Sequence, residues 1–285
     1  MSASQNLSSE GVVAILWTFT AAAFLLTIGR FAIHWRNGKK FVWDDILNGC
    51  ALLALLVFGI TYQVVGAPNY DLQFRNPDAF EKSMSSEPKL RRMNDVMIVG
   101  FWCVIYFVKA SFLALYWTLF ALSQKFRIAW WIVTAYTFFT FAATITWRWV
   151  LIFTANTSDQ HCIDLVLGWA IFDIFGDILL MVLPLTMLSP LRMRISQKIG
   201  LGLIFGLVVI NIILEILRTV LLVVVDFKRF QGYGEVGFIL QATLAVITCA
   251  LPCYRGLMIK RKRVPNWSLP TIAVDVDVED KDDSE

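Results

Sequence analysis

Three long stretches without a charged side chain constrain this sequence more than any other feature. They cover residues 11–29, 128–147 and 236–254. A helix rises about 1.5 Å per residue, so about 20 apolar residues cross the roughly 30 Å of hydrocarbon in a bilayer. Strands of a membrane β-barrel would instead alternate apolar and polar residues over about ten positions. These stretches are continuously apolar, and they therefore predict membrane-spanning helices.

The composition supports the same class of protein. Of the 285 residues, 58% are hydrophobic and 16% are charged, whereas soluble domains average about 25% charged residues. The chain has too little charge to cover a soluble enzyme of this size. We predict an all-α fold, a polytopic membrane protein with a seven-transmembrane helix bundle. The predicted spans lie near residues 11–34, 44–66, 95–120, 129–153, 166–189, 200–225 and 235–258.

The distribution of lysine and arginine predicts the orientation. Positive residues favour the cytoplasmic side of a membrane, and residues 1–10 contain none. We expect the N-terminus to be outside and the C-terminus inside. Residues 1–10 are then extracellular or lumenal, 11–258 form the membrane domain, and 259–285 form a cytoplasmic tail. The tail is basic and then acidic, and we expect it to be disordered.

Ionisable residues inside the predicted spans are the candidate functional residues. A charged group in hydrocarbon costs about 2.5–3.5 kcal/mol on insertion scales, so it usually faces the bundle interior and has a partner. Six residues meet this description: Lys109, Arg148, Asp173, Asp177, Glu215 and Arg218. Asp173 and Asp177 lie four apart on one helix face, where like charges repel unless a cation is close.

Two interpretations of these residues stay open. In the first, they form structural ion pairs that hold the third, fifth and sixth spans together. In the second, they line a polar pocket in which Asp173, Asp177 and Glu215 are catalytic and Lys109, Arg148 and Arg218 bind a lipophilic molecule. A carboxyl kept protonated by burial could then act as a general acid in a cyclisation or isomerisation. The aromatic side chains expected to line that pocket are Trp102, Trp147, Trp149, Trp169 and Phe172.

The acidic pair Asp44 and Asp45 has a simpler interpretation. It opens the second predicted span, where we expect it to cap the helix and to meet Arg30, Lys39 or Lys40.

Cofactor and nucleic-acid motifs are missing from the sequence. There is no glycine-rich phosphate loop, no CxxC pair and no HExxH motif, and the only histidines are His34 and His161. We therefore predict no cofactor, no metal and no nucleic-acid partner. The expected partners are the lipid bilayer and a lipophilic metabolite.

A set of motifs from about residue 30 to residue 257 resembles the fungal rhodopsin-domain family of integral membrane proteins, the group that includes the satratoxin-cluster type. The matching positions are Arg30, Asp44-Asp45, Tyr106, Lys109-x-Ser111-x-Leu113, Tyr116, Cys162-Ile163-Asp164, Asp177, Leu183-Pro184, Leu191, Gln197-Lys198, Leu201, Arg218 and Cys249-x-Leu251-Pro252. The sequence departs from the family pattern at Asp173 and Glu215, which replace an asparagine and a small residue. Both departures add a carboxylate to the bundle interior.

The resemblance implies a protein of fungal secondary metabolism that binds a lipophilic small molecule. A membrane-embedded cyclase or isomerase without a cofactor and a receptor-like sensor of an extracellular molecule are the alternatives. Despite the family's name, retinal is not expected, because the predicted last span (235–258) has no lysine for a Schiff base.

Two kinds of covalent modification are also predicted. Asn6 and Asn156 lie in Asn-x-Ser/Thr sequons that face outside on this topology, so both are candidate glycosylation sites. Cys162 lies in a predicted outer loop. In the family that the chain resembles, its disulfide partner falls where this chain has the sequence Trp147-Arg148-Trp149. A disulfide between Cys162 and Cys103 requires the third span to begin deeper in the sequence than its predicted start at residue 95, and this pairing stays open.

Overall fold

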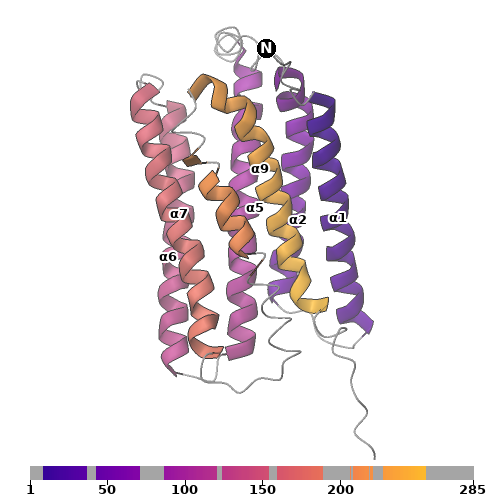
Figure 1. Ribbon diagram of the computed structural model, residues 1–285, viewed down its shortest axis with the longest axis vertical. Coiled ribbons are helices and arrows are strands. Elements are labelled where there is room, and N and C mark those ends of the chain that lie inside the picture. Colours follow the sequence, from indigo (N-terminus) through magenta and orange to yellow (C-terminus); the bar gives the residue numbers. More distant parts are fainter. Residues whose placement is uncertain are drawn as a thin grey trace, which may run out of the picture.

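The fold is a bundle of long helices that run side by side along one axis (Figure 1). The computed structural model describes residues 9–36, 43–70, 87–120, 124–153, 159–188, 206, 208–217, 219–220 and 227–254. Its elements are α1 (Ser9–Arg36), α2 (Trp43–Thr61), the π-helical η1 (Tyr62–Gly66), α5 (Pro88–Phe120), α6 (Gln124–Phe153), α7 (Asp159–Leu188), α9 (Phe227–Ala250) and the 3₁₀ turn η2 (Leu251–Tyr254). Within these residues no strand occurs, as the all-α prediction requires.

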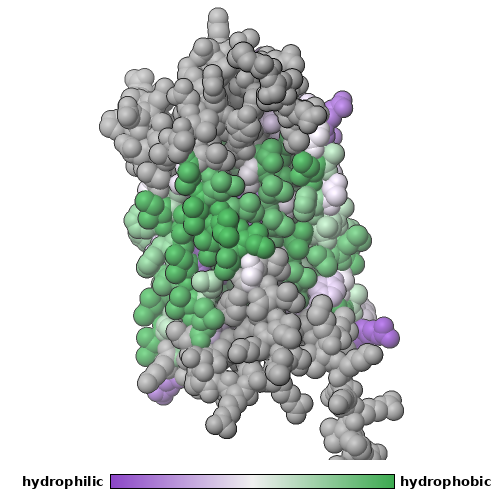
Figure 2. All heavy atoms as spheres, viewed as in Figure 1, coloured by the Kyte–Doolittle hydropathy of each residue, from purple (hydrophilic) through white to green (hydrophobic). Residues whose placement is uncertain are grey.

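Five of the described helical segments are long and apolar enough to cross a membrane. They are Ser9–Arg36, Trp43–Tyr70, Pro88–Thr118, Phe126–Thr146 and Val236–Tyr254, and Val208–Leu217 is a shorter apolar helix. Large apolar side chains face outward along them; Leu25 is 69% exposed and Phe138 is 72% exposed. Figure 2 shows apolar residues gathered in a broad band across the middle of the face in view. Water-soluble monomers rarely expose so continuous an apolar surface, so this band is the face that contacts lipid.

The two other predicted spans, at 166–189 and 200–225, overlap described helices whose bounds differ from the predicted ones. The predicted span at 166–189 falls almost entirely within α7, and the helix Val208–Leu217 lies within the predicted span at 200–225. The last helix, α9, begins at Phe227, ahead of the predicted start at residue 235.

Helix α5 is the central element because it packs against α2, α6, α7 and α9. Its contact with α2 is the most extensive among the described elements, and Gly100 of α5 faces the backbone of Phe58 in α2 there. Next to this contact the ring of Phe101 meets Phe238 of α9 edge-on, with centroids 4.7 Å apart. Side chains on the inward face of α5 are therefore surrounded by protein rather than lipid.

Candidate functional site

The first polar cluster is centred on Lys109, which lies on α5 and is only 5% exposed. Its Nζ donates to Asp173 Oδ1 at 2.7 Å and to the backbone oxygen of Asp173 at 3.2 Å, and it lies 2.8 Å from Asp177 Oδ1. An ammonium group has three donors, and these three oxygens match them. Lys109 therefore ties α5 to α7 through two ion pairs inside the bundle.

The sequence of α7 explains why both carboxylates reach the same ammonium group. Residues four apart lie one above the other on a helix, so Asp173 and Asp177 project from the same face. Gly176 between them leaves room for the neighbouring helix: a Cβ there would lie 3.3 Å from a ring carbon of Tyr136 and 3.8 Å from Lys109 Nζ. The repulsion expected between the two aspartates is thus offset by the shared cation.

A third carboxylate comes from the short helix Val208–Leu217. Glu215 is fully buried, and it can offer an oxygen within 4.8 Å of oxygens from Asp173 and Asp177. Three carboxylates this close form a grouping that a metal ion could share, but Lys109 Nζ already contacts one oxygen of each aspartate. The site brings together four of the six predicted residues from three separate helices.

A cavity of about 50 Å³ adjoins this cluster. Its wall contains the charged and amide side chains of Lys109, Asp177, Asn211 and Gln241, the phenol ring of Tyr116, and apolar residues such as Phe112. Gln241 is 3% exposed, and its Oε1 has no hydrogen-bond partner among the described residues. A single water needs about 10–15 Å³, so the cavity has room for a few waters or for the polar end of a larger molecule.

The other predicted site residues have different outcomes. Trp102 packs on Phe101 and Tyr106, with ring centroids 5.3 Å and 6.3 Å away, and Phe172 is 54% exposed. Neither lines the cavity, so the prediction of a pocket wall containing these two rings is wrong. Phe172 projects from another face of α7. Trp102 shares the face of α5 that carries Lys109, but it lies about two turns away along the helix.

Several predicted residues lie outside what the structure describes. Arg218 and both candidate glycosylation sites, Asn6 and Asn156, fall in undescribed positions. The side chains of Arg148, Cys162, Trp147, Trp149 and Trp169 are likewise not described, although their backbone is helical. Cys103 is a free thiol.

The second polar cluster lies where α1 ends and α2 begins, and it is centred on Arg30. This side chain is 1% exposed and pairs with both predicted acidic residues, donating from Nε to Asp45 Oδ1 at 2.8 Å and from Nη2 to Asp44. Its Nη1 donates to the backbone oxygen of Cys249 at 2.8 Å. That carbonyl belongs to the last turn of α9, where carbonyls lack helical partners. The prediction that Asp44 and Asp45 meet Arg30 is confirmed.

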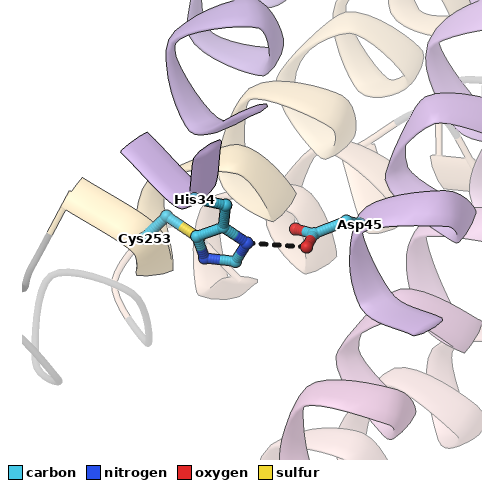
Figure 3. Close-up of side chains that lie close together, drawn as sticks. All are labelled: His34, Asp45 and Cys253. Atoms are coloured by element: carbon cyan, nitrogen blue, oxygen red, sulfur yellow. Dashed lines mark hydrogen bonds and ion pairs between the residues drawn. The ribbon is translucent and has the colours of Figure 1, made fainter. Parts of the chain in front are cut away.

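The same cluster contains a contact that the sequence did not reveal. Figure 3 shows the ring of His34 between Asp45 and Cys253, with Nδ1 2.6 Å from Asp45 Oδ2. On the other side of the ring, Nε2 lies 3.2 Å from Cys253 Sγ. One feature of the sequence could have indicated this contact, because His34, Asp45 and Cys253 all fall toward the predicted inner ends of their spans.

These observations define a helical integral membrane protein with two buried ion-pair clusters. The model of the fungal rhodopsin domain matches residues 29–260. The chain therefore belongs to the fungal rhodopsin domain family. The search of curated proteins and the search of solved structures each gave no match.

Proposed function

We propose that this membrane protein binds a small lipophilic molecule whose polar end enters the cavity beside Lys109 and Asp177. The observation that carries the proposal is the composition of the cavity wall, which combines two charged and two amide side chains with apolar ones. Binding sites for small molecules commonly have this pattern, in which a few polar groups orient a ligand within an apolar pocket.

The polar groups of the cavity wall indicate which functional group the ligand carries. The unpartnered Oε1 of Gln241 is an acceptor, and so are the oxygens of Asp177, whose side chain is 15% exposed. A buried acceptor without a donor is costly, so a ligand with a hydroxyl or amine group would stabilise this site. The remainder of such a ligand would lie against apolar residues such as Phe112 and Leu180.

The proposed setting is fungal secondary metabolism, in a bundle of seven spans with the N-terminus outside and the C-terminus inside. The resemblance to the satratoxin-cluster type and the asymmetric distribution of lysine and arginine support this setting. Metabolite profiles of a deletion strain, complemented with Asp177→Asn or Glu215→Gln, test it.

We expect both substitutions to reproduce the metabolite change of the deletion strain, because Asp177 lines the proposed ligand site and Glu215 can offer an oxygen within 4.8 Å of an Asp177 oxygen. The matched control is Glu10→Gln, the same kind of change at an exposed position of α1, which should restore the normal profile. If both variants fold and give normal metabolites, the ligand site lies elsewhere.

An enzymatic role is the second candidate, and the grouping of Asp173, Asp177 and Glu215 within 4.8 Å favours it. Adjacent carboxyl groups in a dry site can share a proton, and one of them can then act as a general acid. In that case the variants should accumulate an uncyclised or unisomerised precursor, whereas a binding protein would only lower the amount of product.

A further inference from the structure

Cys253, His34 and Asp45 form a hydrogen-bonded chain where α1 ends and α2 begins, and none of the three lines the cavity beside Lys109. Figure 3 shows the imidazole as the link, between the thiol of η2 and the carboxylate of α2. Cys253 Sγ lies 3.2 Å from His34 Nε2, and His34 Nδ1 lies 2.6 Å from Asp45 Oδ2. A nucleophile, a base and a group that orients the base are the parts of a nucleophilic triad.

The contact between Arg30 and Asp45 helps to determine which nitrogen of His34 carries the proton. Arg30 Nε donates to Asp45 Oδ1, so Asp45 Oδ2 is the oxygen that faces the imidazole. A carboxylate only accepts, so the proton of a neutral His34 resides on Nδ1. The lone pair of Nε2 then faces the thiol, which is the arrangement needed to accept its proton.

The thiol lies at the boundary between lipid and water. Trp35 and Trp43, at the adjacent ends of α1 and α2, are 79% and 74% exposed, and exposed tryptophans mark the interface of a membrane. Tyr254 holds η2 against α1 by donating to the backbone oxygen of Leu26 at 2.8 Å. Gly29 permits this contact, since a Cβ there would lie 2.0 Å from the tyrosine oxygen.

We propose that Cys253 is a base-activated thiol that accepts a fatty acyl group from an acyl thioester. His34 Nε2 takes the Sγ proton, and the thiolate attacks the carbonyl carbon of the thioester. A new carbon–sulfur bond forms to Cys253 while the bond to the leaving thiol breaks, and that thiol receives the proton from His34. Asp45 is a positioning residue. On the proposed orientation this end faces the cytoplasm, where acyl-CoA thioesters occur, and the attached chain would enter the bilayer.

A metal ion is the competing occupant, because a thiolate and an imidazole are both ligands for Zn²⁺. The geometry favours the acyl acceptor. One ligand atom from each of the three residues lies within 4.8 Å of the others, so an ion could in principle reach all three. In the arrangement present, however, Asp45 contacts Nδ1 while Cys253 faces Nε2, and an ion bound between the thiol and Nε2 would have two ligands from these residues. In that case Asp45 would orient the histidine rather than bind the ion.

The test uses the full chain in lipid nanodiscs, where both membrane faces are accessible, with an alkyne-tagged palmitoyl-CoA as the probe. We expect the wild type to take up a label that hydroxylamine releases, as a thioester requires. Cys253→Ser should abolish that label, and Cys50→Ser should retain it, because Cys50 is a half-buried thiol in α2. Label that persists in Cys253→Ser would overturn the assignment.

The role of His34 is tested by the rate of labelling. We expect His34→Ala to slow it at least tenfold, since positioned general bases contribute roughly 10²–10⁴-fold. Imidazole added to the buffer should restore part of the rate, which a merely structural role would not allow. An unchanged rate, or a wild type that binds Zn²⁺ through both residues and takes no label, would contradict the proposal. None of these outcomes depends on the ligand of the α5–α7 cavity.

Discussion

Lys109→Met should destabilise the folded bundle by about 3–5 kcal/mol, the typical cost of removing one partner from a buried ion pair. The variant leaves Asp173 and Asp177 facing each other without the ammonium group that lies 2.7 Å and 2.8 Å from their oxygens. Asp173 is 3% exposed and Asp177 is 15% exposed, so water in the small cavity replaces the lost ammonium group only in part. The measurement is the thermal unfolding midpoint of the purified protein in one detergent.

The control for this experiment comes from the same helix. Lys89→Met makes an identical change at an exposed position of α5, so it should change the free energy of unfolding by no more than about 0.5 kcal/mol and leave the midpoint temperature close to wild type. The triple variant Lys109→Met, Asp173→Asn, Asp177→Asn should recover much of the loss, because it removes the buried charges together. Equal midpoints for Lys109→Met and Lys89→Met would show that the cluster does not hold α5 to α7.

Arg30→Met has the second largest expected effect, also about 3–5 kcal/mol. Arg30 reaches Asp44, Asp45 and the carbonyl of Cys249, so its loss takes the guanidinium cation away from two buried carboxylates and a donor away from a helix end. Asp44 is in turn tied to α5, because Ser111 Oγ donates to its backbone oxygen at 2.9 Å. The lost contacts therefore weaken the packing of four helices, α1, α2, α5 and α9. Unfolding curves of the purified protein measure the resulting change in stability.

Arg36→Met is the matched control for this position. Arg36 lies on the same helix and is exposed, so its replacement should change stability little. If Arg30→Met unfolds at the same temperature as Arg36→Met, the arginine does not stabilise the junction of α1, α2 and α9.

The charged core of both clusters could be predicted from the sequence because charge is rare in an apolar span. Lys109, Asp173, Asp177 and Glu215 were identifiable one by one, since an ionisable group in hydrocarbon needs a partner. The pairing of Asp44 and Asp45 with Arg30 was predicted on another ground, because the two aspartates open the second predicted span close to that arginine. Their burial and their pairing agree with that reasoning.

Uncharged polar residues and the rotational phase of each helix could not be predicted in this way. Gln241 looks ordinary in a hydropathy pattern, and its position in the cavity wall depends on how α9 turns toward α5. The same phase decides that Phe172 faces outward. His34 and Cys253 are 219 residues apart, and no local pattern links them. Only the packing of α1 against α9 and η2 brings the imidazole to the thiol.

The most direct test of the proposed ligand site is native mass spectrometry of the protein purified from the membranes of its own source organism. We expect the wild type to carry a small lipophilic molecule that Asp177→Asn loses and that Glu10→Gln keeps. Finding no bound small molecule in the wild type, or the same molecule at the same occupancy in Asp177→Asn, would contradict the assignment of the cavity beside Lys109 as a binding site.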